Sequence, residues 1–318
     1  MHFCVARPPA KLHHLITPRA LNCTKTVTSG RANNFEIASG ALAAGAVKIK
    51  LRSGESRLNY ECIRVSTTDH ITRVTLNRPD SLNSINQLMH DELQEAFDQF
   101  AADDDQYLCV IAGTGERAFS AGSDLKSIAK RGKSHDYPRS GYAGLIERFE
   151  LDKPLIAAVD GIAVGGGFEL ALACDILIAT RRSRFGLPEP LIGAIAIAGG
   201  MHRLSRQVGL KQAMGLILTG DIIDAEAADR MGIITQLVDH DELDETVDMW
   251  CEKILRCAPL AVRASKQTVM RGLDEASLED AMRHQETYPT FKVCYNSTDK
   301  REGAIAFSEK RPPQWTGK

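Results

Sequence analysis

The fold is decided by the stretch KPLIAAVDGIAVGGGFELALACDILIATRRSRFGLPEPLIGAIAIAGGMHRL, residues 153–204. It contains an apolar strand, a triple glycine, a glutamate that opens a helix, a second strand, and a second glutamate within FGLPEP. Glu169 and Glu189 each lie beside a glycine or proline break, where a fold displays side chains. Two carboxylates beside a glycine-lined corner of the backbone suit acid/base chemistry on a carbonyl compound.

The segments around this stretch alternate between strand and helix patterns. HITRVTLNRP alternates as a half-buried strand, SINQLMHDELQEAFDQFAAD has apolar residues at helical spacing, and YLCVIAGTG is a short apolar strand. AFSAGSDLKSIA is a turn that enters a helix, and the polar segment from about Lys126 to Tyr142 is expected to be a loop. The pattern predicts an α/β fold, with a core over residues 56–258 and a helical C-terminal region over residues 259–318.

Composition and charge narrow the function classes. The 318 residues are 43% hydrophobic and 25% charged with a net charge of −2, so the balance gives no case for nucleic-acid or membrane-surface binding. No apolar run is long enough for membrane insertion. The 8 cysteines form no CxxC pair and no zinc spacing, which favours reduced thiols, an intracellular compartment and no metal site.

Residues 1–55 differ from the rest of the chain. They are rich in Lys, Arg, Ser and Thr, contain few acidic residues, and show no sustained hydrophobic periodicity. This composition is typical of a transit peptide, with the mitochondrion as the first expected location and the cytoplasm or peroxisome as alternatives. A disordered extension or a wrongly assigned start codon would look similar. The C-terminal residues Thr316–Lys318 do not form a peroxisomal tripeptide.

Two glycine turns are candidate hydrogen-bond donors. Gly165–Gly167 precede a helix, so their backbone amides are uncovered and feel the positive end of the helix dipole. AFSAGSDLK is a second glycine turn that enters a helix. Such amides can donate to a developing oxyanion. The alternative is that both turns serve only tight strand–helix packing.

Each glutamate also has a structural alternative. Glu169 could merely stabilise the first turn of its helix, although the apolar sequence that follows makes a carboxylate there costly without a partner or a role. Glu189 lies between Pro188 and Pro190, and it could be a loop carboxylate. Its ion-pair partner would then be Arg181, Arg182 or Arg184.

Four separated segments resemble, in order and spacing, the signature of the enoyl-CoA hydratase/isomerase (crotonase) superfamily: AFSAGSDLK, KPLIAAVDGIAVGGGFELALACD, FGLPE and GGMHRL. The resemblance covers roughly residues 60–318, including the AIAFSEKRPPQW tail, and it looks most like the carnitinyl-CoA dehydratase branch. It implies a spiral of ββα units with a helical C-terminal trimerisation region. The implied reaction is that of a hydro-lyase, the reversible hydration of an enoyl-CoA in fatty acid β-oxidation.

The resemblance also assigns roles to individual residues. The oxyanion-hole amides fall on Ser123 and Gly166, and the two catalytic glutamates fall on Glu169 and Glu189. By this likeness Glu189 handles the proton at C2, and Glu169 orients and activates water. Isomerases of the superfamily often keep only one glutamate, so the pair favours hydration over isomerisation.

The resemblance implies coenzyme A binding at Ala121, Ser123, Lys126 and Lys310, with Lys310 reaching the nucleotide end from its own or a neighbouring subunit. No cofactor is implied, because coenzyme A arrives as part of the acyl-CoA substrate. The resemblance implies a homotrimer or a hexamer built as a dimer of trimers.

One segment departs from the family pattern. Where the family usually has Gly-x-x-Pro-Gly or Pro-Asp, residues 193–200 read GAIAIAGG, so the proline is lost and Ala196 and Ile197 are expected to reshape the acyl pocket. Three other functions stay open: an enoyl-CoA δ-isomerase, a carnitinyl-CoA dehydratase-like lyase, and a non-catalytic binding protein.

Overall fold

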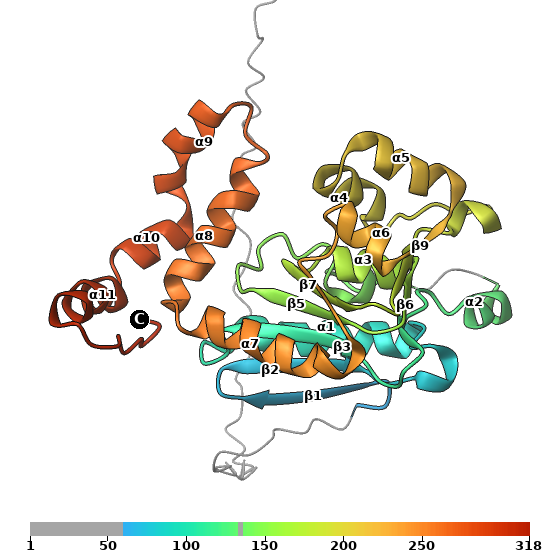
Figure 1. The fold of residues 1–318 in the computed structure, drawn as a ribbon, viewed down its shortest axis with the longest axis horizontal. Helices are drawn as coiled ribbons and strands as arrows, with labels where there is room; N and C mark the ends of the chain where they lie inside the picture. Colours follow the sequence, from blue (N-terminus) through green and yellow to red (C-terminus); the bar gives the residue numbers. More distant parts are fainter. Residues whose placement is uncertain (1–59, 133–135) are drawn as a thin grey trace, which may run out of the picture. The chain divides into compact units, whose positions relative to one another are not determined.

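The computed structural model describes residues 60–132 and 136–318. The predicted transit peptide over residues 1–55 lies outside the described residues. The fold is α/β, as predicted, and is built on two sheets (Figure 1). The larger sheet has the order β1 (Ile63–Thr68), β2 (Ile71–Leu76), β3 (Leu108–Gly113), β5 (Leu155–Val159), β7 (Ile176–Thr180) and β10 (Gln236–Val238). The smaller sheet has the order β4 (Ala118–Ser120), β6 (Ile162–Val164), β8 (Arg184–Gly186) and β9 (Ile222–Asp224).

The strands alternate between the two sheets along the chain. β3, β5 and β7 pair in parallel in the larger sheet, and the strand that follows each of them enters the smaller sheet. Helices α2 (Leu125–Arg131) and α3 (Gly166–Leu172) close the first two of these units. This is the repeating ββα arrangement that the family resemblance implied.

The central strands are apolar because both faces of the larger sheet are covered. In β3, Leu108 and Val110 pack into a cluster with Leu243 and Val247 of α7 (Leu243–Leu255). The alternate residue Cys109 faces the main core, which α1 (Gln87–Ala102) joins from the other side of the sheet. A parallel strand buried on both faces reads as a continuous apolar run, whereas β2 alternates between buried and half-buried residues.

The remaining helices follow the second half of the chain. They are α4 (Gly200–Gln207), α5 (Leu210–Thr219), α6 (Ala225–Arg230), α8 (Pro259–Gly272), α9 (Leu278–His284), α10 (Pro289–Tyr295) and α11 (Thr298–Glu309). Short 3-10 turns are η1 (Pro79–Ser81), η2 (Tyr142–Gly144), η3 (Glu189–Ile192), η4 (His240–Glu242) and η5 (Gln285–Thr287). No strand follows residue 259 in the described chain, as expected.

The C-terminal tail is fixed to the start of α11. Asp299 is only 1% exposed and accepts hydrogen bonds from the N–H groups of Thr316 and Gly317, at 2.7 and 2.9 Å. Trp315 donates its indole N–H to the carbonyl of Arg256 at the end of α7. The tail therefore joins α11 to the end of α7, the helix that covers one face of the larger sheet.

The polar segment near Lys126 was predicted incompletely. It is not a loop from Lys126 onward, because α2 runs to Arg131. The Asp124 carboxylate accepts the N–H of Ser127 at 3.0 Å as an N-cap, and Gly132 adopts the left-handed conformation that ends the helix. These two caps offset the weak apolar pattern of the helix itself.

Candidate active site

The first feature of the site is the glycine turn between β6 and α3. Gly165 has φ of 54° and ψ of −132°, a conformation that side-chain-bearing residues rarely adopt. It turns the chain so that Gly166 becomes the first residue of α3. The first N–H of a helix has no acceptor within its own helix. The triple glycine thus presents an uncovered amide, as the sequence predicted.

The second glycine turn lies directly against the first. Gly122 has φ of +80°, and a Cβ on it would lie 2.8 Å from the Gly166 nitrogen. The Ile85 N–H donates to the Gly122 carbonyl, and the Ile85 carbonyl accepts the N–H of Asp124. These two bonds hold the chain on either side of Ser123. Among the described residues neither the Ser123 N–H nor the Gly166 N–H has an acceptor. The structure thus brings together the two amides predicted as oxyanion donors.

Glu169 is buried one helical turn into α3. Its side chain is enclosed, with the residue 3% exposed, and its Oε1 accepts the N–H of Gly200 at 2.8 Å. Burial raises the pKa of Glu169 from 4.5 to about 7, the nearby charge of Glu189 adds to this, and the Gly200 N–H opposes it. A carboxyl group with this pKa can both take and give a proton near neutral pH.

Glu189 opens η3 and points back to the glycine turn. A Cβ on Gly165 would lie 3.1 Å from Glu189 Oε1, so the carboxylate lies beside the start of α3. Its Oε2 is buried without a hydrogen-bond partner in the described part of the chain. Burial raises the pKa of Glu189 above its ordinary value. A desolvated carboxylate oxygen without a partner is costly, which favours a functional role.

The ion pair that would have explained Glu189 structurally is not formed. Arg181 pairs with Asp239 at 3.0 Å, and Arg182 pairs with Asp160. Arg184 is exposed and forms no ion pair with Glu189 in the described chain. The loop-carboxylate alternative is therefore wrong.

The raised pKa of Glu169 predicts how stability depends on pH. The folded protein favours the protonated form of the Glu169 carboxyl. Its contribution to the free energy of unfolding is therefore largest below about pH 4.5 and is lost as the pH rises through about 7. The shift corresponds to about 3 kcal/mol. Glu169→Gln removes this titration, so the variant should gain about that much stability relative to the wild type between about pH 4 and about pH 8. Urea unfolding at both pH values measures this, and a difference independent of pH would contradict the assignment.

Two neighbours of the glutamates were not predicted from the sequence. Arg203 on α4 donates to the carbonyl of Ile146 at 2.6 Å, and its positive charge lowers the pKa of Glu169. Tyr142 in η2 places its hydroxyl 3.3 Å from Ser123 Oγ. The only sequence signal for them was their position, one within GGMHRL and one beside a glycine in SGYAG.

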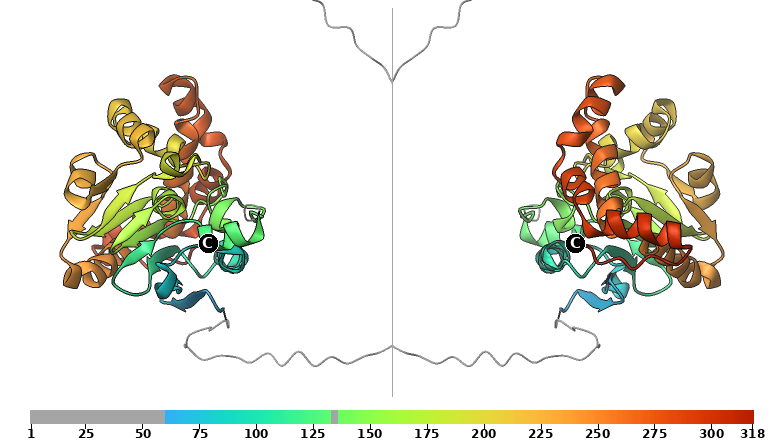
Figure 2. Two further views of the ribbon diagram at one scale, coloured as in Figure 1. Left: turned by 90° about the vertical axis from the view of Figure 1, so that its right-hand side faces the viewer. Right: turned by 90° about the vertical axis from the view of Figure 1, so that its left-hand side faces the viewer.

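The predicted coenzyme A residues fall in two separate places. Ala121 and Ser123 lie on the second glycine turn, and Lys126 is exposed on the first turn of α2. Lys310 is the C-cap of α11. Helices α2 and α11 lie on opposite sides of the sheets and face the viewer in turn in Figure 2. A single chain therefore does not bring Lys310 to the other three residues.

The segment that departs from the family pattern covers Glu169. Ala196 and Ala198 are buried, at 4% and 5% exposed, and Ile197 between them is 62% exposed. Ile197 therefore points outward in the single chain and does not fill a closed pocket. Gly200 ends this segment, and a Cβ there would lie 2.8 Å from the Cγ of Glu169.

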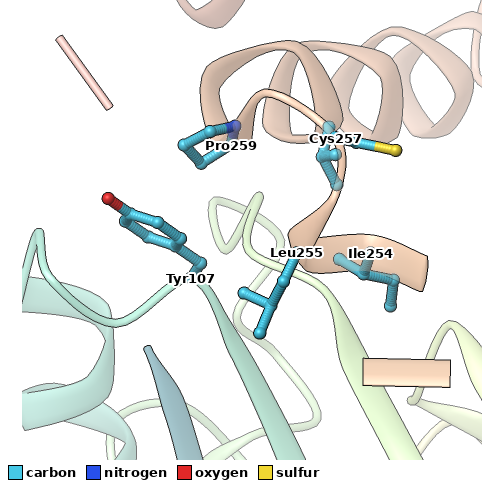
Figure 3. Close-up of a pocket in the computed structure, with 6 residues that line it drawn as sticks. Tyr107, Ile254, Leu255, Cys257 and Pro259 are labelled. Atoms are coloured by element: carbon cyan, nitrogen blue, oxygen red, sulfur yellow. The ribbon is translucent and has the colours of Figure 1, made fainter. Parts of the chain in front are cut away.

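The hollow shown in Figure 3 is separate from this site. It is lined by Tyr107, Ile254, Leu255, Cys257, Pro259 and Val262, where the loop after α7 meets the start of β3. Its volume of about 10 Å³ has room for at most one water molecule. In residues 60–132 and 136–318 no group of acidic, histidine or cysteine side chains could hold a metal ion. No helix among the described residues could cross a membrane.

The fold and the site together define an acid/base enzyme of the α/β class, in which two free amides, the buried Glu169 and the half-buried Glu189 lie around two adjoining glycine turns. The model of the enoyl-CoA hydratase/isomerase family matches residues 66–318. The chain belongs to this family.

Individual relatives agree with this assignment. Carnitinyl-CoA dehydratases from Salmonella typhi and Escherichia coli are 37% identical to the chain, covering 81% of it and 99% of their own length. The crystal structure of an enoyl-CoA hydratase from Mycobacterium tuberculosis matches with a TM-score of 0.75 at 36% identity, over 81% of this chain and 99% of that one. An enoyl-CoA hydratase from Bacillus anthracis matches with a TM-score of 0.74 at 34% identity, over 81% and 100%.

Proposed function

We propose that the protein is a hydro-lyase that reversibly adds water across the 2,3 double bond of a 2-enoyl-CoA thioester. One observation carries the proposal. Two glutamates with raised pKa values, the buried Glu169 and the half-buried Glu189, lie close to the glycine turn that presents the Gly166 amide. Isomerisation needs a single proton-transferring group, whereas hydration has two protons to move, so a pair of carboxyls suits hydration.

The geometry supports separate roles for the two amides and for each of the two glutamates. The amides of Ser123 and Gly166 bind the thioester carbonyl oxygen and stabilise the negative charge that develops there. Glu169, as the carboxylate, takes a proton from the water that attacks C3. Glu189, protonated, delivers a proton to C2. Two neighbouring carboxyls disfavour double ionisation, which keeps one protonated while the other is charged.

Turnover of a substrate panel tests the proposal. The purified protein is mixed with 2-enoyl-CoA thioesters of increasing chain length, with 3-hydroxyacyl-CoA thioesters and with carnitinyl-CoA, which the names of the relatives suggest. The absorbance of the conjugated enoyl thioester should fall with the enoyl compounds and rise with the hydroxy compounds. The proposal is wrong if the whole panel stays unchanged.

The C-terminal helices support self-association, as in the homotrimer or dimer of trimers that we propose. Eight large apolar side chains on or beside α8–α11 are at least half exposed in the single chain: Val269, Met270, Leu273, Leu278, Met282, Val293, Tyr295 and Phe307. A patch of this kind marks an interface more often than a free surface. Assembly would also offer Lys310 to the site of a neighbouring copy. Light scattering of the purified protein measures the number of copies.

We also propose that the protein is mitochondrial, that it acts in fatty acid β-oxidation, and that its first 55 residues are cleaved. The support for them is the basic, acid-poor composition of that segment. N-terminal sequencing of the mature protein distinguishes a cleaved chain from an intact one that begins at Met1.

A further inference from the structure

Tyr142 places a phenol between the two residues whose amides are unpaired. The residue is 3% exposed, and its hydroxyl lies 3.3 Å from Ser123 Oγ. A Cβ on Gly166 would collide with the hydroxyl and the ring of Tyr142, so the phenol packs directly on the Gly166 backbone. The hydroxyl is therefore in contact with both sides of the predicted oxyanion site.

The backbone that carries Tyr142 is held in an unfavourable conformation. Within η2, Ala143 has φ of 53°, and Gly141 and Gly144 on either side also have positive φ. A non-glycine residue in this region costs about 1 kcal/mol or more. A Cβ on Gly144 would lie 2.6 Å from the Gln94 nitrogen, so the turn is pressed against α1. Strain of this kind persists where the surroundings over-determine it, often at active sites.

His90 fixes the turn and the ring together. It is fully buried on α1, and its Nδ1 accepts the N–H of Ala143 at 3.0 Å. Its ring meets the Tyr142 ring edge-on, with centroids 4.7 Å apart and an interplanar angle of 86°. Tyr137 packs on the same ring from another side, at 5.5 Å. The phenol thus has little freedom to move away from Gly166.

One of the two hydroxyl hydrogens of Ser123 and Tyr142 is free to donate a further hydrogen bond. Two hydroxyl groups carry two protons, and the single hydrogen bond between them uses one. Burial and the nearby charges of Glu169 and Glu189 raise the pKa of Tyr142, so the phenol stays neutral at ordinary pH. A neutral, buried phenol beside two free amides is a donor and not an anion.

We propose that Tyr142 is a third hydrogen-bond donor to the carbonyl oxygen of the bound thioester and that Ser123 Oγ is a positioning group for its hydroxyl. The inference rests on the proposed function, because it takes an acyl-CoA as the ligand. Its basis is the placement of one phenol against both Ser123 and Gly166 by a strained turn. Such a donor would strengthen as negative charge develops on the oxygen.

Kinetics of Tyr142→Phe provide the first test. The substitution removes one oxygen and keeps the ring, so kcat should fall by about 10²- to 10³-fold with a smaller change in KM, as for loss of one oxyanion donor. Tyr107→Phe is the matched control, because it removes the same atom at the remote hollow of Figure 3 and should leave kcat unchanged. Thermal unfolding of both variants checks that the fold is retained.

The absorbance of a bound chromophoric ligand separates a donor from a structural support. A cinnamoyl thioester of coenzyme A should shift to longer wavelength when the site polarises its carbonyl, and the shift should shrink in Tyr142→Phe. An equal shift in both proteins overturns the Tyr142 proposal, whatever happens to kcat. If the wild type binds the probe with no shift, the oxyanion site itself is wrong, and the proposed function fails with it.

Ser123→Ala tests the positioning role, since it keeps the backbone amide and removes only the hydroxyl. It should lower kcat by a smaller factor than Tyr142→Phe does. In the double variant it should add no further loss, because Ser123 Oγ acts through Tyr142. A full additional loss in the Tyr142→Phe background would show that Ser123 Oγ acts on its own.

Discussion

Replacing Glu189 by glutamine should lower kcat by about 10²- to 10⁴-fold, the range found for loss of a proton-transferring group. Glutamine has nearly the same size and shape as glutamate, so we expect the backbone between Pro188 and Pro190 to keep its conformation. Oε2 of Glu189 is buried without a partner among the described residues, so the substitution breaks no hydrogen bond at that oxygen. Stability should stay equal or rise, because a desolvated carboxylate has been removed.

Steady-state kinetics and thermal unfolding measure the two effects of this substitution. Glu116→Gln is the matched control. The Glu116 side chain is 79% exposed, and its carboxylate lies as far as 3.9 Å from the guanidinium of its partner Arg182. An exposed ion pair of this kind contributes little to folding stability, so the control should match the wild type in both turnover and thermal unfolding. Unchanged turnover in Glu189→Gln would show that Glu189 transfers no proton.

Gly122→Ala should unfold the protein more easily and abolish turnover in what remains folded. Gly122 has φ of +80°, which costs an alanine about 1 kcal/mol or more. Its new Cβ would also lie 2.8 Å from both the Gly166 nitrogen and the Val164 carbonyl oxygen. Both are backbone atoms that cannot rotate away, so overpacking adds about 1–3 kcal/mol. The two amide turns would separate, and with them the two oxyanion donors.

Gly232→Ala is the matched control for this substitution. Its φ of +79° is nearly the same, yet a Cβ there would meet nothing within 4 Å. The control therefore carries the conformational cost alone, and urea unfolding of both variants isolates the cost of contact. Equal losses in the two variants would mean that the turns are not in tight contact.

Local patterns were sufficient for the elements with strong periodicity. The alternation in β2, the helical spacing in α1 and the apolar runs of β3, β5 and β7 all appear in the structure as predicted. The short strands β4 and β6 were missed, because three residues carry no readable period. β1 and β10 were missed because their residues are mostly half-buried at an edge of the sheet.

The site was predictable only as far as its motifs are local. The two glycine turns and both glutamates are visible in the sequence, but their meeting depends on tertiary contacts. The amide that binds Glu169 belongs to Gly200, 31 residues further along the chain. Tyr142 reaches Ser123 because η2 folds against α1, and no spacing rule predicts that contact. Lys310 caps α11 on the other side of the sheets from α2, so the predicted coenzyme A contact of Lys310 would require a neighbouring copy.

Hydration by two carboxyls is tested most directly by the isotopic composition of the product formed from a 2-enoyl-CoA in ¹⁸O-labelled deuterium oxide. Hydration by the Glu169–Glu189 pair predicts a 3-hydroxyacyl-CoA with one ¹⁸O at C3 and one deuterium at C2, read by mass spectrometry. The Glu189→Gln variant should form it far more slowly. A product that gains deuterium without ¹⁸O would be an isomer of the substrate, and it would contradict hydration by two carboxyls.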